Sequence, residues 1–192
     1  EVKKSVKDMD TAASKRIKKN EGGVLIDPVA QALAEAPTLS KEIKNVEPKV
    51  ENINNVLKDL GYSKEARSAW IANIDVETGN TFEHTQQQGG GGNGYGLLQF
   101  DFQKKYYNKY LESNNLTDSP RNQLVFAHES INFNDSVMGM NTKDRKSLIE
   151  AFESKDVDLI TKTFSEKYEK PGIPHLERRI ESANKYYNLL ED

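Results

Sequence analysis

The fold of this chain is decided by residues 70–80, which read WIANIDVETGN. In a helix, Trp70, Ile74 and Glu77 fall on one side, at spacings of four and three. Gly79 ends that helix, so Glu77 lies in its last turn on the apolar side. Apolar surroundings and the negative end of the helix dipole both disfavour a carboxylate anion. A glutamic acid that keeps its proton can donate it to a leaving oxygen, which is the first requirement for breaking a glycosidic bond.

The expected fold around this helix is mainly α. Apolar residues recur at steps of three and four along most of the chain, which is the period of amphipathic helices. We expect helices at 46–60, from 63 to about 78, at 101–112, from 119, at 143–152, at 156–168 and from 174. The stretch Thr78–Tyr95 has weak strand potential, so we expect it to be irregular or to form a small β-hairpin.

The chain also divides by composition. Residues 1–45 are charge-rich and contain few large apolar residues, which is typical of a solvated arm or linker, and they have room for one short helix. Residues 46–192 have the regular apolar period and are expected to form the folded domain, which carries Glu77 and is therefore the candidate catalytic domain.

The overall composition narrows the function. The net charge of -3 gives no basic field for nucleic acid, and the absence of cysteine excludes disulfides and thiolate sites. No apolar run is long enough to span a membrane. The three histidines are dispersed, so we expect neither a metal nor another cofactor.

The loop that follows Glu77 has residues suited to sugars. After the glycine run 89–92 come Gly94, Tyr95, Gly96 and Gln99. Glycines let a backbone approach a ligand closely, and a glutamine amide both donates to and accepts from sugar hydroxyls. The Tyr95 ring offers an aromatic face for a sugar. We therefore expect these four residues to bind substrate.

Here the pattern resembles a known group of enzymes. A helix, a Glu followed closely by Gly, a loop and then Gly96-Leu97-Leu98-Gln99 resemble the goose-type lysozyme and lytic transglycosylase superfamily. The phage tail lysozyme family is closer still, since it has a similar Gln-Leu-x-Phe segment, here 123–126. It also has a late Tyr-Glu-x-Pro segment, here 168–171, before an arginine-containing helix.

This resemblance implies a lysozyme-like fold and a muramidase that cleaves the MurNAc-GlcNAc β-1,4 bond of peptidoglycan with Glu77 as general acid. It implies a virion protein of the phage tail, or one ejected from it, acting in the bacterial cell wall or periplasm. Residues 1–45 would then contact other virion proteins. Tyr168 is expected on the far wall of the cleft, although its spacing equally fits a core aromatic. Arg178 and Arg179 are expected to pair with Glu166 or Glu181.

The identity of a second catalytic carboxylate is open at this point. Inverting hydrolysis needs a base that holds a water, and Asp101 is our first candidate, with Asp75 and Glu83 as others. Without such a base, a lytic transglycosylase that forms 1,6-anhydro-MurNAc is expected instead. An inactive lysozyme-like structural or peptidoglycan-binding module of the virion is the alternative outside enzymes.

Overall fold

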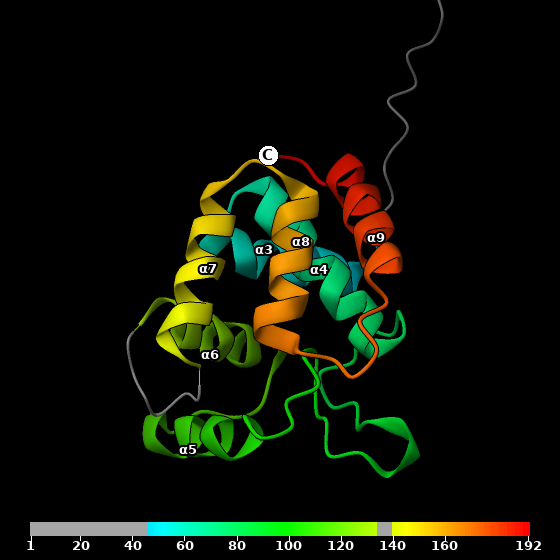
Figure 1. Ribbon diagram of the computed structural model, residues 1–192. Coiled ribbons are helices and arrows are strands. Elements are labelled where there is room, and N and C mark those ends of the chain that lie inside the picture. Colours follow the sequence, from blue (N-terminus) through cyan, green and yellow to red (C-terminus); the bar gives the residue numbers. More distant parts are fainter. Residues whose placement is uncertain (1–45, 134–139) are drawn as a thin grey trace, which may run out of the picture. The chain divides into compact units, whose positions relative to one another are not determined.

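The computed structural model describes residues 46–133 and 140–192 (Figure 1). Within these ranges the chain forms seven α-helices: α3 (Pro48–Asp59), α4 (Lys64–Thr78), α5 (Lys104–Asn114), α6 (Pro120–Asn132), α7 (Thr142–Glu153), α8 (Val157–Phe164) and α9 (Leu176–Leu189). The expected mainly helical domain is confirmed. The predicted N-terminal arm with its short helix lies outside the described residues and stays a prediction.

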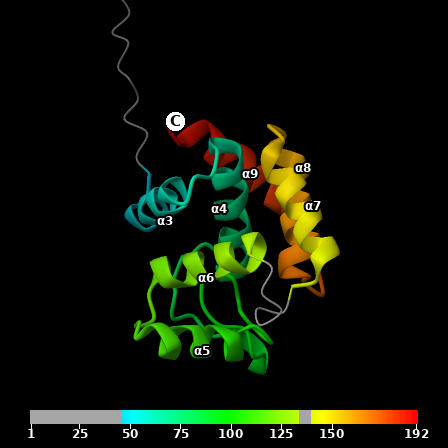
Figure 2. The ribbon, with the colours of Figure 1, turned by 90° about the vertical axis from the view of Figure 1, so that its left-hand side faces the viewer.

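Helix α4 is the centre of the domain, with α3, α8 and α9 packed around it (Figure 2). Its start is capped by Ser63, whose Oγ accepts a hydrogen bond from Ala66 N. Gly79 ends it in the left-handed conformation, with φ of 60°. Residues 66–75 are all buried, so α4 is covered on every side rather than along one apolar stripe. Any polar side chain in this segment must therefore find a partner inside the protein.

Aromatic rings fill the core beside α4. The Trp70 ring is fully buried and lies 4.5 Å from the Phe164 ring and 5.5 Å from the Tyr62 ring, measured between centroids. Large aromatic side chains contribute most of the apolar area in such a core. They fix the position of α4 relative to α8, and hence the place of its last turn.

The segment between α4 and α5 is irregular. Within residues 46–133 and 140–192 no strand forms, and the expected small β-hairpin is reduced to one isolated antiparallel bridge between Gln87 and Tyr95. A short 3₁₀ turn, η1 (Gly89–Gly91), lies at the tip. The strand part of the prediction was therefore wrong, because a run of glycines has little strand propensity.

The end of one helix also differs from expectation. The helix predicted for 156–168 is α8, which ends at Phe164 and continues as a π-helical turn, η3 (Ser165–Glu169). Lys170 closes this turn in the left-handed conformation, and its N–H donates to Ser165 O.

None of the helices in the described ranges combines the length and apolar character needed to cross a membrane.

Candidate active site

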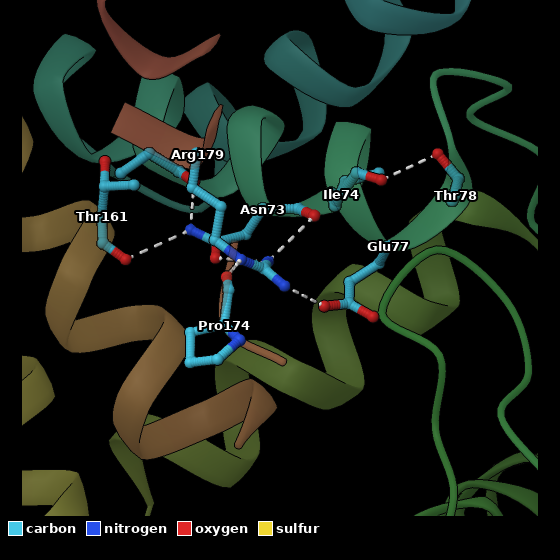
Figure 3. Close-up of polar contacts among 8 residues, drawn as sticks. Asn73, Ile74, Glu77, Thr78, Thr161, Pro174 and Arg179 are labelled. Carbon is cyan, nitrogen blue, oxygen red and sulfur yellow. Dashed lines mark hydrogen bonds and ion pairs between the residues drawn. The ribbon is translucent and has the colours of Figure 1, made fainter. Parts of the chain in front are cut away.

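Glu77 lies in the last turn of α4, as predicted, with its side chain 16% exposed. One of its carboxylate oxygens, Oε1, accepts a hydrogen bond of 2.5 Å from Arg179 Nη2 (Figure 3). Oε2 has no protein partner among the described residues. The apolar surroundings expected for this carboxyl are thus only part of its environment, because a guanidinium group holds one of its oxygens.

Arg179 comes from α9 and is 1% exposed. Its Nε donates to Pro174 O at 2.8 Å, and its Nη1 donates to Asn73 Oδ1 at 2.8 Å. Asn73 in turn donates to Ala69 O in its own helix at 2.8 Å. The guanidinium is therefore fixed from several sides before it meets Glu77, and Figure 3 shows these contacts converging on it.

The predicted partners of the two arginines were wrong. Arg179 pairs with Glu77, while Glu166 forms an ion pair with Lys162 at 3.9 Å. The reason is the face of α9 that packs on α4, which carries Arg179, Ser182, Ala183 and Tyr186 at helical spacing. Arg178 is one position away from this face and is exposed.

Glu169 is a second carboxyl near this pair, and it was noted in the sequence as part of the segment 168–171 but given no role. Its Oε1 is buried and has no hydrogen-bond partner among the described residues. Burial raises its pKa well above the usual range, the charge of Glu77 raises it further, and Arg179 acts in the opposite direction. Its position at the end of a π-helical turn could not be read from the apolar period. Such turns occur frequently at functional sites.

Three carboxylates were proposed from the sequence as the catalytic base, and each has its own surroundings in the structure. Asp75 is buried and accepts a hydrogen bond of 2.6 Å from Ser182 Oγ in α9. Glu83 is exposed and pairs with Lys49 at 2.5 Å. Asp101 is exposed in the turn before α5, where its backbone N–H donates to Gln103 Oε1. The structure thus commits Asp75 and Glu83 to other partners, and Asp101 stays a candidate.

Two glycines of the loop, Gly94 and Gly96, lie against glutamine side chains of the protein itself. A Cβ on Gly94 would lie 2.8 Å from Gln99 Oε1, and one on Gly96 would lie 2.7 Å from Gln123 Nε2. Gln99 has φ of 45° and its Nε2 donates to Gly96 O at 2.8 Å. The close approach predicted here is therefore made by internal side chains, and a role of these residues in sugar binding stays a prediction.

Gln123 of α6 holds this loop in place. Its Oε1 accepts from Leu97 N at 2.8 Å, and its Nε2 donates to His84 O at 2.7 Å and to Asp118 Oδ1 at 2.9 Å. Gln123 is fully buried, and its bond with Leu97 N is buried as well, while the bonds to His84 O and Asp118 Oδ1 are partly buried. The resemblance pointed to the segment 123–126, but the pattern gave no indication of what its glutamine does.

Asp118 gathers the hydroxyls of Tyr95 and Tyr107 together with the Gln123 amide. Burial alone would raise the pKa of Asp118, but these hydrogen bonds outweigh it and lower the pKa. Lys104 Nζ lies over the Tyr95 ring, 4.6 Å from its centroid. Tyr95 is thus held by protein partners, and its predicted contact with a sugar is untested.

Tyr168, the other predicted substrate residue, lies in the aromatic core. It is 4% exposed and stacks on Phe164, with ring centroids 5.0 Å apart. This agrees with the core interpretation of its spacing. Its hydroxyl oxygen is buried beside the Ser130 side chain and makes no hydrogen bond of ordinary geometry to the described residues.

The described site lies within a region that a known family shares. A comparison with curated proteins finds no match. The sequence profile of the phage tail lysozyme family, in contrast, matches residues 49–190, which include α4 with Glu77, the loop with Gln99 and α9 with Arg179. Since this match covers most of the chain, the protein belongs to the phage tail lysozyme family.

Proposed function

We propose that this protein is a muramidase that cleaves the MurNAc-GlcNAc β-1,4 bond of peptidoglycan with Glu77 as its general acid. Membership of the phage tail lysozyme family implies peptidoglycan-degrading, lysozyme-like activity. The observation that carries the finer assignment is the Glu77 carboxyl, which lies at the partly exposed end of the central helix and is oriented by a buried arginine.

The chemistry proposed for Glu77 follows from its two oxygens. Oε1 is bound to Arg179, which fixes the plane of the carboxyl group. A proton on Oε2 is then presented to the glycosidic oxygen, and the leaving sugar departs as a neutral alcohol when the bond to the anomeric carbon breaks. Water completes hydrolysis at that carbon, with Asp101 as the proposed base and Gln99 as a proposed ligand of the sugar.

The test compares wild type with Glu77→Gln in the clearing of a cell-wall suspension. A glutamine amide has no proton to donate, so we expect the rate to fall by about 100- to 10,000-fold. Glu153→Gln is the matched control, because Glu153 also ends a helix but is exposed, and it should clear walls at the wild-type rate. Clearing by folded Glu77→Gln at the wild-type rate would refute Glu77 as the acid. Absence of clearing by folded wild type would instead favour an inactive or merely peptidoglycan-binding module.

A lytic transglycosylase is the second candidate. Two of the three carboxylates proposed as the base, Asp75 and Glu83, are bound to other groups, which favours a reaction that needs a single acid/base residue. In that reaction the 6-hydroxyl of MurNAc attacks its own anomeric carbon. Mass spectrometry of the products separates the two, since hydrolysis leaves a reducing MurNAc and transglycosylation leaves the anhydro sugar.

The family also indicates the setting. Its tail lysozymes are associated with the virion, so we propose that this protein acts on the cell wall during phage entry, in the wall itself or the periplasm. Residues 1–45 lie outside the matched range, and we propose that they contact other virion proteins.

A further inference from the structure

The turn 95–100, which carries Gln99, is held in an unusual backbone conformation. Tyr95 N donates to Phe100 O at 3.1 Å, and Phe100 N donates to Tyr95 O at 2.8 Å, so the two ends of the turn are joined. Inside it, Gln99 has φ of 45°, in the left-handed region that residues other than glycine rarely adopt. Such a conformation persists only where the surrounding structure enforces it, and it occurs frequently at functional sites.

Apolar packing fixes one side of this turn. Leu97 and Phe100 are fully buried. The Phe100 ring lies 5.3 Å from the Tyr107 ring of α5 and 5.5 Å from the Phe126 ring of α6, measured between centroids. Apolar burial has no direction, however, so it does not determine how the polar side of the turn is oriented. That orientation depends on hydrogen bonds.

The hydrogen bonds of the turn lead to Asp118, in the connection between α5 and α6. Its Oδ2 accepts from the Tyr95 hydroxyl. Its Oδ1 accepts from the Tyr107 hydroxyl at 2.7 Å and from Gln123 Nε2 at 2.9 Å. Gln123 Oε1 in turn accepts from Leu97 N at 2.8 Å. One carboxylate therefore links the turn, directly at Tyr95 and through Gln123 at Leu97, to both helices.

The charge of Asp118 strengthens these links. Burial favours the neutral acid, but the three hydrogen bonds outweigh it and lower the pKa of Asp118, so the group is a carboxylate at neutral pH. Burial and the bond with Asp118 raise the pKa of Tyr95 to about 12, which keeps its hydroxyl a donor. A hydrogen bond to an ionised acceptor is roughly twice as strong as one between neutral groups.

The tip of the loop lacks such support. A Cβ added to Gly89, Gly90 or Gly91 would meet no atom within 4 Å, whereas one added to Gly94 would lie 2.8 Å from Gln99 Oε1. The loop thus has an open tip and a closely packed base. Gln99, the proposed ligand of the sugar, belongs to the base that Asp118 holds.

We propose that Asp118 is a positioning residue, which holds the turn 95–100 so that Gln99 meets the sugar in a fixed orientation. This inference rests on the proposed function, in which Gln99 binds the substrate. Asp118 acts through Gln99 and touches no reacting atom itself. Without its charge, the backbone at Gln99 can relax and the sugar is bound more weakly, while Glu77 keeps its own support from Arg179.

The test measures kcat and KM on soluble peptidoglycan strands for wild type, Asp118→Asn, Gln99→Gly and the double variant. Glycine removes the amide and adopts the left-handed conformation freely. We expect Asp118→Asn to raise KM by about five- to tenfold, the effect of roughly one hydrogen bond. Its kcat should change less, because lost binding of the substrate raises KM alone. In the Gln99→Gly background the same substitution should leave KM unchanged, since no amide is left to position.

A milder pair of variants covers the case in which Asp118→Asn does not fold. Tyr107→Phe removes one of the three donors to Asp118 and should raise KM about twofold, again only when Gln99 is present. Tyr106→Phe changes the neighbouring tyrosine, whose ring lies under Lys105, and should leave KM at the wild-type value. Asp59→Asn is the matched aspartate control, because Asp59 forms only an exposed pair with Arg121.

Amide hydrogen exchange gives a readout that does not depend on activity. Exchange at Leu97 N, whose acceptor Gln123 is bound to Asp118, should speed up by about tenfold in Asp118→Asn, while exchange within α4 should stay as in wild type.

The outcomes separate this proposal from the proposed function. An equal rise in KM with and without Gln99 would overturn the positioning role, because Asp118 would then act independently of Gln99. A folded Asp118→Asn with the KM and the Leu97 exchange rate of wild type would overturn it as well. A folded wild type that cleaves no peptidoglycan would instead refute the proposed function, and the positioning role with it.

Discussion

Replacing Arg179 with lysine tests whether the guanidinium group orients Glu77. Arg179 donates four hydrogen bonds: to Pro174 O, to the backbone O and Oδ1 of Asn73, and to Glu77 Oε1. Lysine keeps the positive charge, but it has one nitrogen on a flexible stem. That nitrogen cannot reach acceptors arranged for a planar fork.

The magnitude follows from the bonds that are lost. If the lysine ammonium keeps only Glu77, then Pro174 O and Asn73 Oδ1 lose a charged donor inside the protein. A hydrogen bond to a charged group contributes about 1.5–3 kcal/mol, so losing two of them should lower the free energy of unfolding of Arg179→Lys by about 3–6 kcal/mol. For a domain of this size that corresponds to roughly 6–24 °C in Tm.

The assay has two readouts. Thermal unfolding followed by circular dichroism gives the change in Tm. Wall clearing, measured at a temperature well below the Tm of both wild type and variant, gives the activity of the folded protein. We expect activity to fall by about 100-fold, because a misplacement of 1 Å can cost that much. Arg178→Lys, in the exposed neighbour, is the control and should change neither. A Tm and a clearing rate for Arg179→Lys that both equal those of wild type would refute the reasoning.

Two further predictions concern residues that support the site. The folded-state pKa of Glu169 is raised, so the protein loses stability as pH rises from the unfolded value towards the folded one. Glu169→Gln should therefore gain in Tm relative to wild type between pH 4 and pH 8, and a Tm difference independent of pH would contradict this. Gly96→Ala places a Cβ against Gln123 at φ of 79° and should destabilise the protein by about 2–3 kcal/mol in urea unfolding. Gly91→Ala has a similar φ but open space, so it should cost only about 1 kcal/mol, and equal losses for the two would show that Gln123 is not the cause.

Features that depend on helical period alone were predictable from the sequence. The spacing of Trp70, Ile74 and Glu77 placed the carboxyl in the last turn of a helix that Gly79 ends, and the structure agrees. The same spacing could not show that α4 is buried on every side from Ala66 to Asp75. That depends on which helices pack around it, and packing partners are not encoded in the period of one segment.

Contacts between distant segments were not predictable. Glu77 and Arg179 are 102 positions apart, and no local pattern indicates that Arg179 rather than Arg178 faces α4. The place of the Glu169 side chain was not predictable for another reason, because a π-helical turn shifts the face on which a side chain lies and breaks the helical count. The sequence could not show why position 96 must be a glycine, because the side chain that a Cβ there would meet, Gln123, comes from a distant helix.

The origin of Arg179 in α9 has a consequence for the biosynthesis of this protein. Glu77 leaves the ribosome long before Arg179 does, and until α9 has docked the carboxyl has no guanidinium to orient it. Docking of α9 also buries Ala183 and Tyr186, so the packing that completes this side of the core is the same packing that brings the guanidinium to Glu77. A chain in which α9 has not docked would therefore lack the group that orients the proposed acid.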